Sequence, residues 1–272
     1  MDIPFWKMHG AGNDFILVDD RGLTFPAADR AWLRRLCARR DGVGAEGVIL
    51  LQPSTRAHVR MRFFNPDGSD AALCGNGARC VARLAHDLGA APAALRLETD
   101  AGEVAARVSG DTVRLDLPDP SGIRLGVPLD VPGAGRLAVD LVCVGVPHAV
   151  VWVTDPDALD IAALGGAIRH HPALAPEGAN ADFAAAAPDG TVRVRTYERG
   201  VEAETLACGT GMAACAVAAA LGGRAAPPVR LRCRHGETLT VDMKAEQGRV
   251  RDLTLEGPAV HVFRGVLEYP SA

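Results

Sequence analysis

Apolar and polar residues alternate along several stretches of the chain, and this pattern predicts strands. The alternation is cleanest at Val59–Phe64 and Thr191–Tyr197, and each of these stretches leads through a polar turn toward a cysteine. Further strands are expected at Ile3–Met8, Phe15–Val18, Val48–Leu51, Leu95–Thr99, Gly102–Val108, Thr112–Leu117, Leu137–Val146, Ala149–Thr154, Asp182–Ala184, Val229–Cys233, Thr238–Met243, Val250–Leu255 and Val260–Leu267. The chain is therefore expected to be rich in sheet.

Two alanine-rich runs interrupt this pattern and predict helices. Ala78–Leu88 is followed by Gly89, and Met212–Leu221 is followed by Gly222; glycine is the usual residue just after a helix. Both runs are apolar on nearly every side, which is typical of a helix surrounded by other elements. Two further helices are expected at Ala27–Arg39 and Ala158–His170.

A four-residue sequence motif precedes each alanine-rich run: CGNG at Cys74–Gly77 and CGTG at Cys208–Gly211. The two cysteines are 208 − 74 = 134 residues apart, almost half the chain, and the order of elements around them is the same. This repetition predicts an α+β fold of two similar halves, each a mostly antiparallel sheet wrapped around one central helix.

The boundaries of the two halves follow from the turn-rich segment Pro118–Gly122, which is the best linker candidate. The N-terminal half is expected to comprise residues 1–118 and the C-terminal half residues 119–261. The final strand-like stretch is expected to return to the first half, which adds residues 262–272 to it.

Each four-residue motif is expected to place a thiol and several backbone N–H groups at the start of a helix. That end of a helix carries about half a positive charge and unpaired donors, so it suits an anion such as a carboxylate. A cysteine there can have its pKa lowered from roughly 8.5 to about 3.5–7.5. The sequence therefore predicts two activated thiols, Cys74 and Cys208.

Composition narrows the function classes. The net charge of −4 gives no reason to expect nucleic acid or a membrane surface as a partner, and no apolar run approaches the roughly 18 residues of a spanning helix. The N-terminus lacks the features of a secretory signal, so the cytoplasm is expected.

The seven cysteines are odd in number and lack CxxC spacing, which favours neither a disulfide framework nor a metal site. Only Lys7 and Lys244 could form a Schiff base with pyridoxal phosphate, and neither has a phosphate-binding loop beside it. The sequence therefore predicts no cofactor.

Three segments closely resemble the diaminopimelate epimerase family: Phe5–Phe15, Phe64–Cys80 and Tyr197–Gly211. The resemblance extends from end to end of the chain. It implies a cofactor-independent epimerase of lysine and peptidoglycan synthesis that interconverts LL- and meso-diaminopimelate. It also implies two pseudo-symmetric halves with the active site in a cleft between them, and a homodimer.

The same resemblance implies roles for individual residues. Cys74 and Cys208 match the catalytic acid and base, and His148 and Glu198 match polar residues that lie beside the thiols and matter for activity. The residues that match substrate-binding positions are Asn13, Asn65, Gly75, Asn76, Asn180, Glu198, Arg199, Gly209 and Thr210. Among these, the glycines, Asn76 and Thr210 match the helix-end positions that hold the reacting carboxylate.

Two cysteines suit this chemistry because inverting an α-carbon requires a base on one face and an acid on the other. Each candidate also has an ordinary structural interpretation. The asparagines are common turn residues, Glu198 and Arg199 could form a surface ion pair, and free cysteine is often a small buried hydrophobe. We assign the last interpretation to the five other cysteines: Cys37, Cys80, Cys143, Cys215 and Cys233.

The chain departs from the family pattern in three places. Val146 stands where asparagine is common, the turn Ala45–Gly47 is unusual, and the stretch Glu198–Cys208 is one residue longer than the commonest version. These departures concern recognition of the distal end of the substrate, and Val146 keeps a racemase or epimerase for another amino acid open as an alternative. A thiol redox or metal-binding protein, or a non-catalytic binding module, are the alternatives from other classes.

Overall fold

The computed structural model describes residues 1–246 and 248–270, and the chain divides into two compact units. The N-terminal unit comprises Met1–Leu115 with Gly257–Ala272, and the C-terminal unit comprises Asp116–Glu256. The corresponding boundaries predicted from the sequence follow residues 118 and 261. Residues 271 and 272 of the predicted range 262–272 lie outside the described residues.

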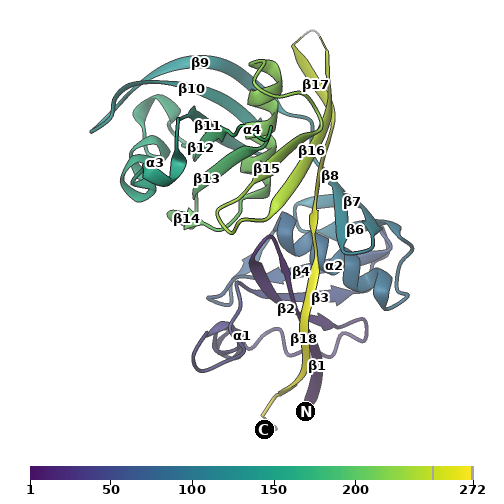
Figure 1. Cartoon of the computed structure of the whole chain (residues 1–272). Helices are drawn as coiled ribbons and strands as arrows, with labels where there is room; N and C mark the ends of the chain where they lie inside the picture. Colours follow the sequence, from purple (N-terminus) through teal and green to yellow (C-terminus); the bar gives the residue numbers. More distant parts are fainter. Residues whose placement is uncertain (247, 271–272) are drawn as a thin grey trace. The chain divides into compact units, whose positions relative to one another are not determined.

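The N-terminal unit contains strands from both ends of the chain (Figure 1). Its elements are β1 (Asp2–Gly10), β2 (Asn13–Asp19), α1 (Arg30–Cys37), β3 (Val48–Gln52), β4 (Val59–Phe64), β5 (Asp70–Ala71), α2 (Gly75–Asp87), β6 (Ala94–Thr99), β7 (Gly102–Ser109), β8 (Thr112–Asp116) and β18 (Val260–Glu268). The predicted return of the last strand is confirmed, because β18 pairs with β1 along its length.

The C-terminal unit is continuous in sequence. Its elements are β9 (Ser121–Val131), β10 (Gly135–Val144), β11 (Val146–Trp152), a short 3₁₀ turn at Pro156–Ala158, α3 (Ile161–Arg169), a second 3₁₀ turn at Pro172–Leu174, β12 (Asn180–Ala186), β13 (Val192–Glu198), β14 (Ala203–Thr205), α4 (Gly209–Leu221), β15 (Val229–Arg232), β16 (Thr238–Glu246) and β17 (Arg249–Pro258).

The two units repeat the same strand pairings in the same order. In the N-terminal unit β18, β1 and β2 pair antiparallel, β2 and β3 parallel, β3 and β4 antiparallel, β4 and β6 parallel, and β6, β7 and β8 antiparallel. In the C-terminal unit β9 to β13 and β15 to β17 repeat each of these steps. The predicted α+β class and duplication are therefore confirmed.

Each sheet curves around one helix. The prediction that both helices are apolar on nearly every side is confirmed for α4 and wrong for α2, which carries Arg79, Arg83, His86 and Asp87. Helix α2 contacts β1, β2, β3, β4, β6 and β7, while α4 contacts β10, β11, β12, β13, β15 and β16. The buried side chains of α2 join one continuous apolar core, and α4 is buried from Gly211 to Ala219. The outer helices cover other surfaces: α1 packs on β3, and α3 packs on β12 and β13. A helix enclosed in this way is fixed in place, which makes its first turn a rigid position for chemistry.

Two local predictions differ from the structure. The stretch Leu137–Val146, predicted as one strand, is divided because Gly145 adopts a φ of 69° and separates β10 from β11. The alternation pattern does not predict strand β9 at all, because Gly122, Gly126 and Pro128 interrupt it and most of its residues are exposed. Since β9 begins at Ser121, the connection between the units is shorter than the predicted linker Pro118–Gly122.

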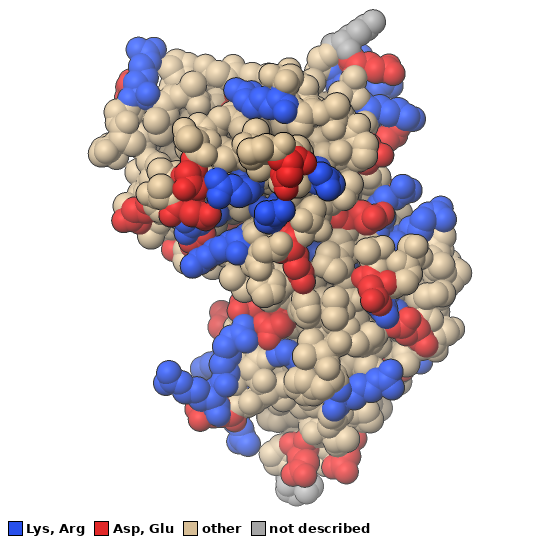
Figure 2. Space-filling model, in the orientation of Figure 1, with Lys and Arg blue, Asp and Glu red and all other residues tan. Residues whose placement is uncertain are grey.

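Charged side chains of both signs are mixed on the molecular surface. On the face drawn in Figure 2, positive and negative side chains lie next to one another over both units. Over residues 1–246 and 248–270, no helix has the length and apolar content needed to traverse a bilayer. The expectation that nucleic acid and membranes are not partners stays a prediction.

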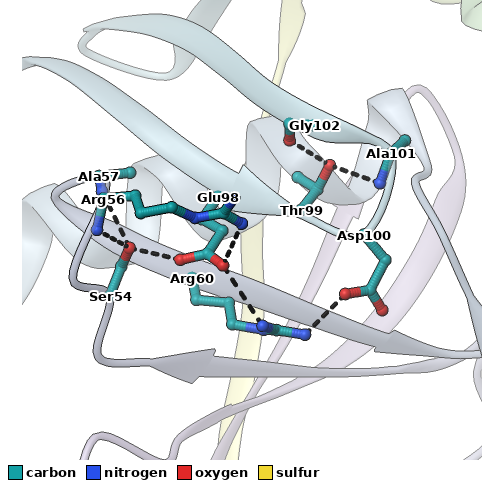
Figure 3. A network of polar contacts seen from close by, with 9 residues as sticks. All are labelled: Ser54, Arg56, Ala57, Arg60, Glu98, Thr99, Asp100, Ala101 and Gly102. Carbon is teal, nitrogen blue, oxygen red and sulfur yellow. Dashed lines mark hydrogen bonds and ion pairs between the residues drawn. The ribbon is translucent and has the colours of Figure 1, made fainter.

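One such mixed group joins β4 to β6 in the N-terminal unit (Figure 3). The Glu98 carboxylate, whose side chain is 9% exposed, accepts hydrogen bonds from Ser54 (2.5 Å), Arg56 (2.6 Å) and Arg60 (3.3 Å). Arg60 also reaches Asp100 at 2.6 Å. This network ties the ends of two neighbouring strands together at the surface.

Candidate active site

The two cysteines of the repeated motif occupy the same position relative to their helices. Cys74 is the N-cap residue of α2 and Cys208 is the N-cap residue of α4; both have extended backbone conformations, and both helices are 13 residues long. Neither side chain caps its own helix. Each thiol therefore lies at the end of a helix where unpaired N–H groups concentrate positive charge.

The Cys74 thiol is half-buried and lies near the turn between β1 and β2. Its Sγ is 3.6 Å from Oδ1 of Asn13, to which it donates. Ala11 and Gly12 in this turn have φ values of 56° and 82°, so the turn uses the left-handed backbone region at a non-glycine residue. Such conformations concentrate at functional sites, and here the conformation brings Asn13 to the thiol.

Ion pairs hold the same turn from behind. The buried Lys7 ammonium contacts the Asp14 carboxylate at 2.7 Å, and Arg39 bridges Asp14 (2.8 Å) and Glu46 (2.6 Å). Burial acts to raise the pKa of Asp14, but its hydrogen bonds with Arg39 and Lys7 outweigh burial and lower that pKa. The unusual turn Ala45–Gly47 therefore supports the residue next to Asn13.

The other candidate residues of the N-terminal unit differ in their surroundings. Gly75 begins α2, and Asn76 is 4% exposed, with its Oδ1 accepting a hydrogen bond from the buried Arg79 at 2.8 Å. Asn65 follows β4 and forms a turn, with its side chain donating to Ser69 Oγ at 3.0 Å. The turn interpretation therefore describes Asn65 in this structure, whereas Asn13 contacts the thiol.

The C-terminal unit brings several candidate residues together below the first turn of α4. Nδ1 of His148 lies 2.7 Å from Oδ2 of Asp182, and both side chains are fully buried. Nε2 of His148 lies 3.0 Å from Oγ1 of Thr210 and 3.3 Å from Nδ2 of Asn180. Thr210 Oγ1 is in turn 3.5 Å from the Cys208 sulfur. The structure thus links His148, Asn180 and Thr210 to the second thiol.

The predicted direction of the thiol pKa is wrong for Cys208. Burial raises its pKa well above 9.0, and the carboxylates of Glu198 and Asp182 raise it further. The Thr210 hydroxyl and the Gly211 N–H act in the predicted, lowering direction but are outweighed. Cys208 is therefore a thiol at neutral pH in this structure.

Glu198 is the last residue of β13 and Arg199 follows it, and no ion pair joins these two described side chains. Burial raises the pKa of Glu198; the Thr205 hydroxyl opposes this, and the Asp182 carboxylate adds to it. The Arg199 N–H donates to Asn180 Oδ1 at 2.6 Å, and the Arg199 guanidinium reaches the Glu177 carbonyl at 3.4 Å. Gly209 begins α4.

Sequence reasoning missed Asp182 and Thr196 as members of this group. Thr196 Oγ1 donates to Asp182 Oδ1 at 2.6 Å, and the two residues are paired on β12 and β13. A signal was present, because Asp182 is the one ionisable residue in the otherwise apolar and alanine-rich segment Ala181–Ala187. A carboxylate on such a buried strand needs a partner, which here is His148.

No metal site is formed among the described residues, since no group of three or more His, Cys, Asp or Glu side chains is arranged to hold an ion. No disulfide joins the seven cysteines, all of which lie in the described part of the chain.

The model of a family described as diaminopimelate epimerase matches the chain over residues 5–120 and 141–262. Proteins named diaminopimelate epimerase from Aquifex aeolicus and Chlorobaculum tepidum are 39% and 40% identical to the chain. The first alignment covers 98% of this chain and 100% of the relative, and the second covers 96% and 99%.

Solved structures share the fold at lower identity. A probable proline racemase from Agrobacterium radiobacter superposes with a TM-score of 0.71 at 21% identity, covering 98% of this chain and 93% of that one. A PhzF-family protein from Bacillus anthracis has a TM-score of 0.73 at 16% identity, with coverage of 99% and 100%. At such identities the likeness establishes the fold and nothing further.

Proposed function

Because the chain belongs to the diaminopimelate epimerase family, and is thus an isomerase, we propose that it interconverts LL- and meso-2,6-diaminopimelate by proton transfer at the α-carbon. The observation that carries the proposal is the repeated helix start. Cys74 and Cys208 each immediately precede a 13-residue helix enclosed by a sheet, so each unit supplies one thiol beside a group of backbone donors.

The chemistry requires two opposed groups. One thiolate removes the α-proton from one face of the carbon, and one thiol delivers a proton to the other face, so both must reach the same substrate. The α-proton is weakly acidic. Negative charge builds on the substrate carboxylate as the proton leaves the α-carbon. Backbone donors at Gly75, Asn76, Gly209 and Thr210 suit that charge because they are fixed before the reaction begins.

The surroundings of the two thiols support different starting roles. Cys208 is buried beside two carboxylates, so we assign it the role of proton donor in the resting state. Cys74, half-buried beside Asn13, then acts as the base once it has lost the proton that it donates to Asn13 in this structure. The pair titrates as a coupled system, and the roles exchange when the reaction runs in reverse. His148 and Glu198 adjust the charge around Cys208.

The remaining candidates would hold the rest of the substrate. Asn13, Asn65 and Asn180 offer amide groups, and the planar guanidinium of Arg199 suits the distal carboxylate. The proposed reaction needs no cofactor. We further propose that the protein acts in the cytoplasm, in lysine and peptidoglycan precursor synthesis, as a homodimer.

The test is α-proton exchange in deuterated water. The wild-type protein should interconvert the LL and meso isomers and incorporate solvent deuterium at the α-carbon. Cys74→Ala and Cys208→Ala should each lower turnover by on the order of 10²–10⁴-fold or more while circular dichroism and Tm stay near wild type. Undiminished turnover in either folded variant would contradict the two-base mechanism.

Substrate choice needs its own experiment, since Val146 departs from the family pattern at the start of β11. Exchange should be compared for diaminopimelate and for amino acids that lack a second amino-carboxylate end. Faster exchange with the latter would replace the diaminopimelate assignment with a racemase or epimerase for another amino acid. Absence of exchange with any of them, together with a redox or metal-binding response, would favour the thiol redox alternative.

A further inference from the structure

Three polar residues form a closed group beneath the first turn of α4, and we call them the polar trio: His148, Asp182 and Thr196. They come from three adjacent strands, β11, β12 and β13. The Asp182 carboxylate is 0% exposed and uses both oxygens, one toward His148 Nδ1 (2.7 Å) and one accepting from Thr196 (2.6 Å). A charge this deep is stable only when its partners are held in place.

The contact with Asn180 shows which ring nitrogen of His148 carries the proton. The Arg199 N–H donates to Oδ1 of Asn180 at 2.6 Å, so the amide oxygen is occupied and the NH₂ group points to His148 Nε2. An NH₂ group only donates, and Nε2 must therefore accept. The proton of the neutral ring is on Nδ1, where it donates to Asp182.

The position of the His148 proton also sets the direction of the hydrogen bonds between His148 and the Cys208 thiol. Since Nε2 accepts, the Thr210 hydroxyl donates to it at 3.0 Å. The Thr210 oxygen is then free to accept from the Cys208 S–H, 3.5 Å away. The hydrogen bonds run in one direction, from Cys208 through Thr210 to His148 and on to Asp182, and every step has a donor facing an acceptor.

The fold does not need a polar group below the central helix, because the N-terminal unit has apolar residues at the equivalent position. The corresponding apolar trio is Phe15, Ile49 and Phe63. Strand register establishes the correspondence: Leu17 pairs with Ile49 as Val150 pairs with Asp182, and Ile49 pairs with Phe63 as Asp182 pairs with Thr196. Phe15 and His148 each lie two residues before those first partners, on the same face.

We propose that Asp182 is a positioning residue, which holds the His148 proton on Nδ1 so that Nε2 remains the acceptor of the hydrogen-bond chain from Cys208. The inference rests on the proposed function only in giving Cys208 a chemical role. The chain of contacts itself is independent of the substrate. Asp182 touches neither the thiol nor, in this scheme, the substrate.

Asp182→Asn should reverse the direction of the chain. Thr196 continues to donate to the amide oxygen, so the new NH₂ group faces His148 and forces Nδ1 to accept. The ring proton moves to Nε2 and donates to Thr210 Oγ1, the nearer of its two neighbours at 3.0 Å, while the Asn180 NH₂ group at 3.3 Å has to turn away. The Thr210 hydroxyl then donates to the Cys208 sulfur. Sulfur that receives a hydrogen bond, with one nearby negative charge removed, ionises more easily, so the Cys208 pKa should fall.

The experiment measures the Cys208 thiol in the full-length protein without substrate. Alkylation of the Cys208 peptide is followed by mass spectrometry across pH, and the midpoint of the rate profile is compared, because a midpoint does not depend on accessibility. Asp182→Asn should lower the midpoint, and the thiolate fraction at neutral pH should rise about tenfold for each pH unit by which the midpoint falls. With diaminopimelate, kcat should fall on the order of 10²–10⁴-fold, with little change in KM.

Two further variants keep the inference falsifiable. Thr210→Val removes the hydroxyl through which the reversed chain would reach the sulfur, so adding Asp182→Asn to Thr210→Val should move the midpoint much less than adding it to the wild-type protein. Asp140→Asn is the matched control, because Asp140 is also buried but bonds Trp152 Nε1 and the Gly126 N–H, each at 2.8 Å. It should leave the midpoint in place.

Several titratable side chains surround the Cys208 thiol. Among the described residues, Glu198 on β13 and Asp182 on β12 act on the thiol directly, and His148 on β11 and Cys215 on α4 share their surroundings. An unchanged or raised midpoint in Asp182→Asn, or an equal shift in Asp140→Asn, would overturn the inference. If the wild-type protein showed no epimerase turnover, the proposed function would fail while the midpoints still decided this inference.

Discussion

The first turns of α2 and α4 share one geometry but lie over opposite kinds of core. Beneath α2, the Phe15 and Phe63 rings pack edge to face with centroids 5.9 Å apart, and Ile49 completes the apolar trio. Beneath α4, the polar trio takes the same three places. Gly77 faces the first group and Gly211 faces the second, each three residues after its cysteine.

This difference separates what the fold requires from what the chemistry uses. An apolar trio supports α2 fully, so the buried acid and imidazole below α4 are not there to hold a helix. Replacing a buried charged pair with apolar groups is often neutral or stabilising. The polar trio is therefore best explained by its effect on Cys208. The half-buried Cys74 has the apolar trio below its helix instead.

The largest expected effect comes from converting the polar trio toward the apolar one. The double variant His148→Phe/Asp182→Leu should keep its fold, with stability unchanged or raised by about 1–4 kcal/mol, because no charge is left unpaired. Turnover should fall on the order of 10³-fold, since Cys208 loses its hydrogen-bond chain. Denaturant unfolding and turnover are measured together.

The control for this variant is Ile49→Val in the apolar trio. It should cost about 0.5–1.5 kcal/mol and leave turnover intact. Retention of wild-type turnover in the folded double variant would show that the polar trio has no part in catalysis.

The next effect concerns the two equivalent glycines. A Cβ at Gly211 would meet the Asp182 carboxylate, as well as Thr196 Oγ1 at 3.2 Å, whereas at Gly77 it would meet the flexible ends of Ile49 and Met61. Gly211→Ala should therefore displace the polar trio and lower kcat on the order of 10²-fold. Gly77→Ala should mainly cost stability, about 1–3 kcal/mol. Equal kinetic effects in both variants would remove the distinction between the two helix starts.

A smaller effect concerns the pH dependence of stability. Burial raises the folded-state pKa of Glu198 above 4.5, so the folded protein holds this proton more tightly than the unfolded chain. The resulting stability is present below pH 4.5 and is lost as pH rises through the folded-state pKa. Glu198→Gln should therefore raise Tm at pH 7 and change it little at pH 4. A lower Tm at pH 7 would contradict this sign.

The smallest effect is expected at the polar network of the N-terminal unit in Figure 3. The Arg56 side chain is 65% exposed, and exposed ion pairs contribute little. Arg56→Ala should change the free energy of unfolding by less than about 1 kcal/mol, measured by urea titration, and leave turnover unchanged. A large loss of turnover would show that this network also serves the site.

Much of the architecture could be predicted from the sequence, because its signals are local. The glycine after each cysteine and the alanine-rich runs predict both central helices, whose last residues are Asp87 and Leu221. Alternation places β4 and β13 within one residue of their observed ends. Strand β9 escapes prediction because its glycines and proline break the alternation and much of it faces solvent.

The chemistry of the second thiol could not be predicted in this way, because it depends on residues brought from other strands. The helix start at Cys208 predicts a lowered thiol pKa, but Glu198 and Asp182 approach from β13 and β12 and, with burial, reverse the direction. The local pattern identifies Asp182 only as the start of a strand. Its role depends on register with His148 and Thr196, which no local pattern encodes.

The pairing of β18 with β1 has a consequence for how the molecule is made. The C-terminal unit is one uninterrupted segment, so all of its strands are synthesised before β18. The N-terminal unit must leave one side of β1 uncovered until then. The order of synthesis thus leaves the N-terminal unit to be completed last, and its earliest strand spends translation as an open edge that chaperones would be expected to shield.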